Sequence, residues 1–232
     1  MMNKKAFTLS EVLITLAVVG VVAVLTIPGV MKNYQNRLYT AQFEKVYAQV
    51  SDAIQAIMNE EHVDDFYEST AGGKTVCQAT GEKKCTSGLG YFLQKYFKNV
   101  EENCLKATEP CLKKTVGAYK TVGGANITAP HGDYFVQTVT GAVIGGFYNA
   151  GNNCMSIVVD VNGVGQPNVA GRDVFSFDIR RNGTLADYNS GCAINSMGAA
   201  AASCTKGSTG SIYDAAAGCV NNIIEAGWKM EY

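Results

Sequence analysis

One acidic residue, Glu11, lies inside an almost purely apolar run that extends from Phe7 to Ile27. Placing an ionised carboxylate in hydrocarbon costs roughly 3 kcal/mol on insertion scales, so an acid at such a position indicates a function and requires a partner. That partner must be positively charged, and the apolar run itself contains no basic residue. A free α-amino group, created by cutting the chain just before Phe7, would supply the positive charge.

The residues around Glu11 follow a fixed order. Lys4 and Lys5 precede the segment Ala6-Phe7-Thr8-Leu9-Ser10-Glu11, and the apolar run continues beyond it. This order resembles the prepilin cleavage and methylation motif of type IV pilins and type II secretion pseudopilins. The resemblance covers only the N-terminal part of the chain.

The resemblance implies that a prepilin peptidase cuts after Ala6 and methylates the new N-terminal residue, Phe7. Glu11 would then be the fifth mature residue, which in this family pairs with the N-terminal amine of a neighbouring subunit. Gly20 and Pro28 stand where the family commonly has a helix-loosening glycine and a proline. Ala6 departs from the usual glycine at the cut but is also small.

We therefore expect a structural subunit of a type IV pilus or a type II secretion pseudopilus, and not an enzyme. The resemblance implies a single pass through the bacterial inner membrane, with the C-terminal domain outside the cytoplasm before assembly into a filament. The expected partners are other copies or other pilin-like subunits in a helical filament, prepilin peptidase and an inner-membrane assembly platform. Two alternatives stay open: a minor or tip subunit that binds surfaces, DNA or secreted cargo, and a membrane-anchored periplasmic domain that never polymerises.

Three other interpretations of the apolar run explain less. A secretory signal peptide needs a small-x-small cleavage site after its apolar core, and Val21-Val22-Ala23 is a poor one. A plain membrane anchor accounts for the length, since about 20 apolar residues span a bilayer, but it leaves Glu11 unexplained. A buried core helix would not keep so long a run apolar all round.

All eight cysteines lie outside the apolar run, and an even number in an exported domain indicates disulfides. Zinc is the competing interpretation, but there is no Cys-x-x-Cys pair, and the two histidines, His62 and His131, lie far apart. Short separations favour the pairs Cys77–Cys85 and Cys104–Cys111. The remaining four, Cys154, Cys192, Cys204 and Cys219, would pair among themselves.

Charge and motif content exclude several function classes. The net charge of −1 becomes −3 once residues 1–6 are removed with Lys4 and Lys5, because 17 basic residues then face 20 acidic ones. A dedicated nucleic-acid binder would carry a basic surface. The sequence also has no glycine-rich phosphate loop before a helix and no Gly-x-Ser-x-Gly motif. No enzyme class is indicated.

The segment 160–173 is rich in side-chain oxygens and turn residues. Asp160, Asn162, Asn168 and Asp173 could surround a hard cation such as Ca²⁺, which takes six to eight oxygen ligands. The segment is not an EF-hand, because Gly171 stands where that loop requires an acid. The alternative is a loop in which Asp and Asn bond their own backbone. Calcium is thus a possible cofactor, and no other is indicated.

The elements that position these residues begin with one long helix from Phe7 to about Glu61. Its first half is apolar throughout, and its second half is amphipathic, with apolar residues at three- and four-residue steps. Pro28 should kink it, because proline removes an internal hydrogen bond. We assign residues 1–6 to a leader peptide, 7–30 to a transmembrane or filament-core helix, and 31–232 to a pilin-like globular domain in which helix 31–61 packs on a sheet.

The sequence pattern of the remaining residues predicts a sheet and two further helices. A short helix capped by Ser87 runs through Val100, and a terminal helix runs from Ile212 to Gly227, followed by Trp228 as a packing residue. The expected strands are 134–139, 142–148, 155–161, 174–180 and 184–188. The expected fold class is α+β: a long N-terminal helix whose apolar half projects and whose amphipathic half packs on one face of an antiparallel sheet, in a disulfide-stapled, pilin-like domain.

Overall fold

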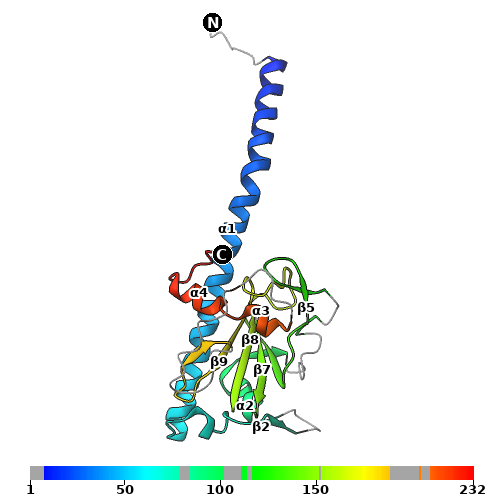
Figure 1. Cartoon of the computed structure of the whole chain (residues 1–232). Coiled ribbons are helices and arrows are strands. Elements are labelled where there is room, and N and C mark those ends of the chain that lie inside the picture. The colour runs from blue at the N-terminus through cyan, green and yellow to red at the C-terminus, as the bar shows by residue number, and fades with distance from the viewer. Residues whose placement is uncertain are drawn as a thin grey trace. The chain divides into compact units, whose positions relative to one another are not determined.

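The computed structural model describes residues 8–78, 84–101, 111–113, 117–151, 153–188, 204 and 210–232 (Figure 1). The side chains of 99–101 are outside this description. The chain divides into two compact units, Met1–Leu38 and Tyr39–Tyr232, which are treated separately below. The predicted boundary at residue 30 stays a prediction.

The first unit consists of the N-terminal part of helix α1, which as a whole extends from Leu9 to Glu61. The predicted long helix is confirmed, and it is continuous through Pro28. The large apolar side chains described in this unit are exposed: Leu13, Leu16 and Val19 are 58%, 65% and 64% exposed. This segment therefore has an apolar surface that the described residues of the chain leave uncovered.

In the second unit, the remainder of α1 buries one face. The buried residues recur at three- and four-residue steps, as the sequence pattern predicts for a half-buried helix: Tyr39, Phe43, Val46, Val50, Ile54, Ile57 and Met58. Phe43 is fully buried and stacks on Phe175 with ring centroids 4.1 Å apart. The amphipathic half of the helix thus forms one wall of the main core.

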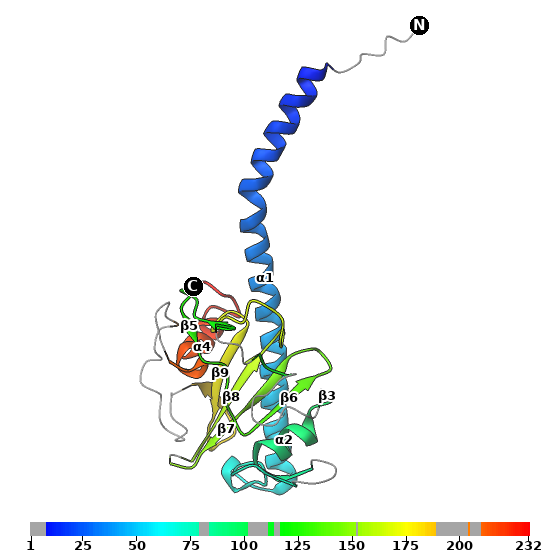
Figure 2. The ribbon, with the colours of Figure 1, turned by 90° about the vertical axis from the view of Figure 1, so that its right-hand side faces the viewer.

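A six-stranded antiparallel sheet forms the centre of the second unit (Figure 2). Its strand order is β10-β9-β8-β7-β6-β3, so the sequence order is kept from β6 to β10, with β3 at one edge. The strands are β3 (Asn99–Glu101), β6 (Tyr134–Thr138), β7 (Val143–Asn149), β8 (Cys154–Asp160), β9 (Val174–Ile179) and β10 (Leu185–Asp187). The predicted strands from 134 to 188 are all confirmed within a few residues.

Two turns of this sheet depend on glycine. Gly141, between β6 and β7, has a φ of +88°, and Gly183, between β9 and β10, has a φ of +76°. Residues with a Cβ atom rarely adopt positive φ angles because of steric clashes, whereas glycine adopts them readily. At Gly183 a side chain would also collide with the Met58 sulfur, since a Cβ there would lie 2.5 Å from it. This turn therefore packs directly on α1.

Both faces of the sheet are covered, which differs from the expected two-layer arrangement. The face formed by Phe175, Phe177 and Ile179 lies in the main core with α1. The opposite face, which includes Val158 and Val174, forms a second core with helix α3 (Ile212–Ala216). The sequence pattern of β9 identified the first face correctly, but the second face carries the polar residues Ser176 and Asp178 beside Val174, and these concealed its burial.

The two predicted shorter helices have different limits from those expected. Helix α2 spans Gly88–Tyr96 and does not reach Val100, which lies in β3 because it pairs with the edge of the sheet. The predicted terminal helix is two helices, α3 and α4 (Cys219–Glu225). They separate at Gly218, whose φ of +82° is incompatible with a continuing right-handed helix.

The remaining elements are small. They are the 3₁₀ helix η1 (Phe66–Glu68) and two hairpins, formed by β1 (Val76–Cys77) with β2 (Cys85–Ser87) and by β4 (Tyr119–Lys120) with β5 (Asn126–Ile127). Trp228 packs against Phe43 and Tyr47, with ring centroids 6.1 and 5.6 Å away, as expected of a packing residue.

The predicted disulfide chemistry is confirmed where it lies in the described residues. Cys77 is bonded to Cys85, and Cys204 to Cys219. Cys111 and Cys154 are also disulfide-bonded. The predicted partner of Cys111, Cys104, lies outside the described residues, and so does Cys192.

Candidate assembly and metal sites

The acid in the apolar run, Glu11, forms a local hydrogen-bonded turn with Thr8. The Thr8 backbone N–H and its Oγ1 both donate to Glu11 Oε2 at 2.9 Å, and the Glu11 backbone N–H donates to Thr8 Oγ1 at 3.3 Å. This reciprocal pattern is a capping box, which satisfies backbone donors at a helix start. Ala6 and Phe7, the predicted cleavage residues, lie outside the described residues.

Sequence reasoning missed this second role of Glu11, although the signal was present. Thr8-Leu9-Ser10-Glu11 has the Thr-x-x-Glu spacing of a capping box directly before an apolar helix. Both side-chain contacts fall on one oxygen, Oε2. The carboxylate can therefore cap its own helix and still present Oε1 to a cation from another molecule.

Gly20 and Pro28, the other predicted assembly residues, lie in the exposed part of α1. A Cβ placed on Gly20 would meet no atom within 4 Å, so packing within the described chain does not require a glycine there. α1 is also the one helix in the described part that is long and apolar enough to cross a membrane. The exposed apolar surface of the N-terminal part of α1 indicates an apolar environment outside the subunit.

The segment 160–173 leads from the end of β8 to β9 and is partly buried, with Gly165 and Gln166 exposed. The Asp173 carboxylate accepts hydrogen bonds from the backbone N–H groups of Asn168 and Val169, at 2.7 and 2.6 Å. In the orientation that satisfies both of its polar atoms, the Asn168 amide nitrogen donates to the carbonyls of Gly163 and Gly165, at 3.3 and 2.6 Å. These two predicted cation ligands hold the loop together.

The other two predicted ligands retain buried oxygens. Asp160 Oδ1 accepts from the Asn162 N–H at 3.3 Å, whereas Asp160 Oδ2 and Asn162 Oδ1 have no hydrogen-bond partner among the described residues. Burial, and secondarily the charge of Asp173, raise the pKa of Asp160 well above its usual range. Burial raises the pKa of Asp173 to about 6.

These four residues could supply only part of the oxygen ligands that a hard cation requires. Asp160 and Asn162 have oxygens to offer, but Asp173 and Asn168 are engaged with the backbone. Among the described residues, no group of three His, Cys, Asp or Glu side chains is arranged to hold a metal ion. Backbone carbonyls would have to complete a calcium shell of six to eight oxygens.

Thiol chemistry has no basis in the described part of the chain. Its cysteines are all in disulfides. His131 stacks on Phe147, with ring centroids 5.3 Å apart, and meets the edge of Tyr213. This histidine therefore serves in an aromatic cluster beside α3.

Comparison with known proteins gives one match. The prokaryotic N-terminal methylation motif matches residues 1–27. No curated protein and no solved structure matches the chain. Three features indicate the same kind of N-terminal signal. They are the motif, the exposed apolar helix that follows it and the acid near the start of that helix. The chain carries the prepilin-type N-terminal signal of type IV pilins and pseudopilins.

Proposed function

We propose that this protein is a structural subunit of a helical filament, either a type IV pilus or a type II secretion pseudopilus. The observation that carries the proposal is a methylation motif at the head of a helix whose large apolar side chains are exposed from Leu9 to Leu38. Each Val, Leu or Ile side chain on that helix contributes about 1.5–3 kcal/mol when it is fully buried. A lipid bilayer buries it before assembly, and neighbouring subunits bury it in the filament.

The proposed sequence of events begins in the inner membrane. Prepilin peptidase cuts after Ala6 and methylates the amine of Phe7, and an inner-membrane platform then adds the subunit to the filament. The second unit stays outside the cytoplasm, a location with which its disulfides are compatible. Gly20 and Pro28 lie where the helix can loosen as it leaves the bilayer.

Glu11 has two separable roles in this proposal. Its Oε2 caps the helix through Thr8, and its Oε1 pairs with the amine of Phe7 on the adjacent subunit. Pairing removes the cost of an isolated charge in an apolar filament core and sets the axial register between subunits.

The test compares three variants of the full chain. Glu11→Gln keeps an acceptor for the Thr8 cap but removes the charge, so it should insert and be processed but fail to assemble. Glu11→Ala should behave in the same way. Thr8→Ala is the matched control, because it weakens the cap and keeps the charge, and it should still assemble. Intact mass of the membrane fraction reports processing, and sheared-filament yield reports assembly. Normal filaments from Glu11→Gln would contradict the charge-pairing role.

The abundance of the subunit separates the major from the minor role. A major subunit dominates isolated filaments, whereas a minor or tip subunit that binds a surface, DNA or cargo is present in small amounts. A non-polymerising periplasmic domain would keep Met1, so an uncut N-terminus in the membrane fraction would favour that alternative.

We also propose that the loop 160–173 binds Ca²⁺. The supporting observation is the pair of buried oxygens on Asp160 and Asn162 that have no hydrogen-bond partner among the described residues. Millimolar Ca²⁺ added to the chelated full chain in detergent should raise its melting temperature, because a ligand that binds only the folded state stabilises it. Asp160→Asn should abolish the increase. No shift in the parent protein would contradict calcium binding.

A further inference from the structure

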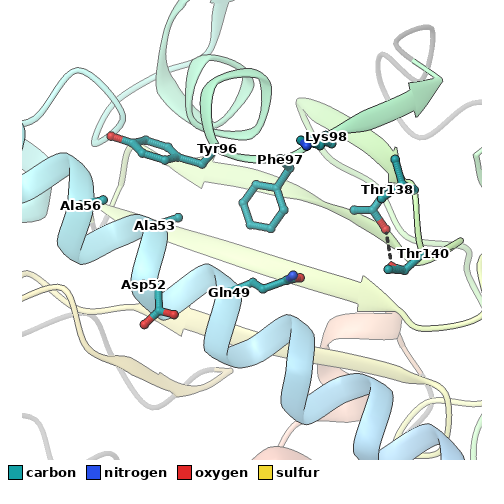
Figure 3. Close-up of a pocket in the computed structure, with 10 residues that line it drawn as sticks. Gln49, Asp52, Ala53, Ala56, Tyr96, Phe97, Lys98, Thr138 and Thr140 are labelled. Carbon is teal, nitrogen blue, oxygen red and sulfur yellow. Dashed lines mark hydrogen bonds between the residues drawn. The ribbon is translucent and has the colours of Figure 1, made fainter.

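The second unit has a groove beside one edge of its sheet. It lies between residues 49–56 of α1, the segment after α2 and the β6–β7 turn, and its volume is about 410 Å³ (Figure 3). Ala53 and Ala56 face it from the helix, and their small side chains leave space that larger residues would fill. Phe97, which is 8% exposed, points into the groove.

The rim of this groove combines an exposed apolar side chain with an exposed base. Val139 is 64% exposed, and its backbone N–H donates to the Lys98 carbonyl at 3.2 Å, so the two residues lie together. The Lys98 side chain makes no ion pair with the described residues. The rim therefore offers an apolar contact and a positive charge side by side at its sheet edge, whereas the exposed Asp52 lines the groove from α1.

The opposite edge of the same sheet carries complementary features. α4 packs on β9 and β10, whereas the groove lies beside β6 and β3, at the far end of the strand order. Ile224 on α4 is 38% exposed, and Glu225 beside it is exposed. In the described part of the second unit, Val76, Val139 and Ile224 are the exposed large apolar side chains, and two of these three lie at these opposite edges.

We propose that α4 of one copy docks in this groove of the next copy. Ile224 would cover Val139, and Glu225 would pair with Lys98. Such a contact joins different surfaces of identical subunits, so it repeats along an assembly and forms rings or helical filaments. The proposal rests on the filament function proposed above and adds a specific lateral contact between the exposed domains.

The first experiment places a photo-crosslinker at the groove in assembling cells. Val139 is replaced by p-benzoylphenylalanine in the full chain, and the dimer band is digested after irradiation. The expected partner peptide is the one that contains Ile224 and Glu225. The same replacement at Val76, which is 52% exposed on the β1–β2 hairpin, is the matched control and should not reach that peptide. A crosslink from Val139 to another segment or to another protein would overturn the proposal.

The second experiment exchanges the two charges. Lys98→Glu and Glu225→Lys should each reduce filament yield, since losing an exposed ion pair weakens each contact by up to about five-fold and the contact repeats in every subunit. The double variant should restore the yield. Lys120→Glu makes the same charge change on β4 and should have no effect. Glu225→Lys should fold normally, because a base suits a helix C-terminus.

The two proposals fail in distinguishable ways. If the charge variants and the double variant all assemble like the parent, the docking contact is wrong, while loss of assembly in Glu11→Gln still supports the filament function. If the parent is neither cut after Ala6 nor recovered in filaments, both proposals fall.

Discussion

The hydroxyl of Tyr67 offers a sharp test of how the sheet is held together. It donates to the Ile179 carbonyl at 2.6 Å and accepts from the Met155 N–H at 2.8 Å. Met155 and Ile179 are paired residues at the end of the β8–β9 ladder, and both are fully buried. One side chain from η1 therefore satisfies two backbone groups of the sheet at once.

The change Tyr67→Phe removes this hydroxyl and leaves both backbone groups without that partner. A buried unsatisfied polar group costs about 1–3 kcal/mol. Tyr67 is itself only partly buried, so water should recover some of the loss, and we expect a destabilisation of about 2–3 kcal/mol in total. For a domain of this size, the melting temperature should fall by about 4–12 °C.

Tyr148→Phe is the matched control for this change. The Tyr148 ring lies beside Tyr67, with centroids 6.3 Å apart, but its hydroxyl donates only to the exposed side chain of Asn153, at 2.7 Å. Removing that hydroxyl should cost less than about 0.5 kcal/mol. The comparison separates loss of the bridge from loss of any tyrosine hydroxyl at this corner.

The assay is urea unfolding of the full chain in detergent, followed by the fluorescence of Trp228. This residue is the only tryptophan and packs on Phe43 in the main core, so its emission reports loss of that core. The reasoning would be refuted if Tyr67→Phe stayed within about 0.5 kcal/mol of the parent, or if Tyr148→Phe lost as much.

Three further predictions use the same assay. Folding raises the pKa of Asp173 from 3.8 to about 6, so in chelator the free energy of unfolding should fall as pH rises from about 4 to 6. Asp173→Asn should reduce that slope, to which the raised pKa of Asp160 also contributes. Phe43→Ala, which removes the ring stacked on Phe175, should cost about 3–5 kcal/mol and lower the urea midpoint. Replacing Cys204 and Cys219, which are 15 residues apart, with Ser should cost about 3 kcal/mol. An unchanged slope or midpoint would contradict the corresponding prediction.

The elements in which apolar residues recur at regular spacing could be predicted from the sequence. α1 and the strands from β6 to β10 follow from the spacing of apolar residues and from the turns at Gly141 and Gly183. The Cys77–Cys85 bond followed from its short separation. These features depend on local pattern, so one sequence was sufficient for them.

The errors arose where distant parts of the chain decide the outcome. β3 pairs with β6 across more than thirty residues, and this pairing ended α2 earlier than its helical spacing indicated. The Tyr67 bridge joins η1 to strands that lie far along the chain. For the loop 160–173, the sequence left open a cation site and a loop in which Asp and Asn bond their own backbone. The folded geometry shows that Asp173 and Asn168 bond the backbone, and calcium binding stays a prediction.

The N-terminus of α4 depends on an aspartate from the edge of the sheet. Asp187 on β10 accepts from the Gly218 N–H at 2.6 Å and the Asn221 N–H at 2.9 Å, whereas Gly218 itself supplies no side-chain cap. A seven-residue helix is too short to be stable alone, so α4 should form only after the β9–β10 edge is complete. Incompletely folded subunits would then lack the surface of Ile224 and Glu225. Under the docking proposal, a subunit whose sheet edge is incomplete would lack the contact surface on α4. A growing filament would therefore incorporate only subunits that have finished folding.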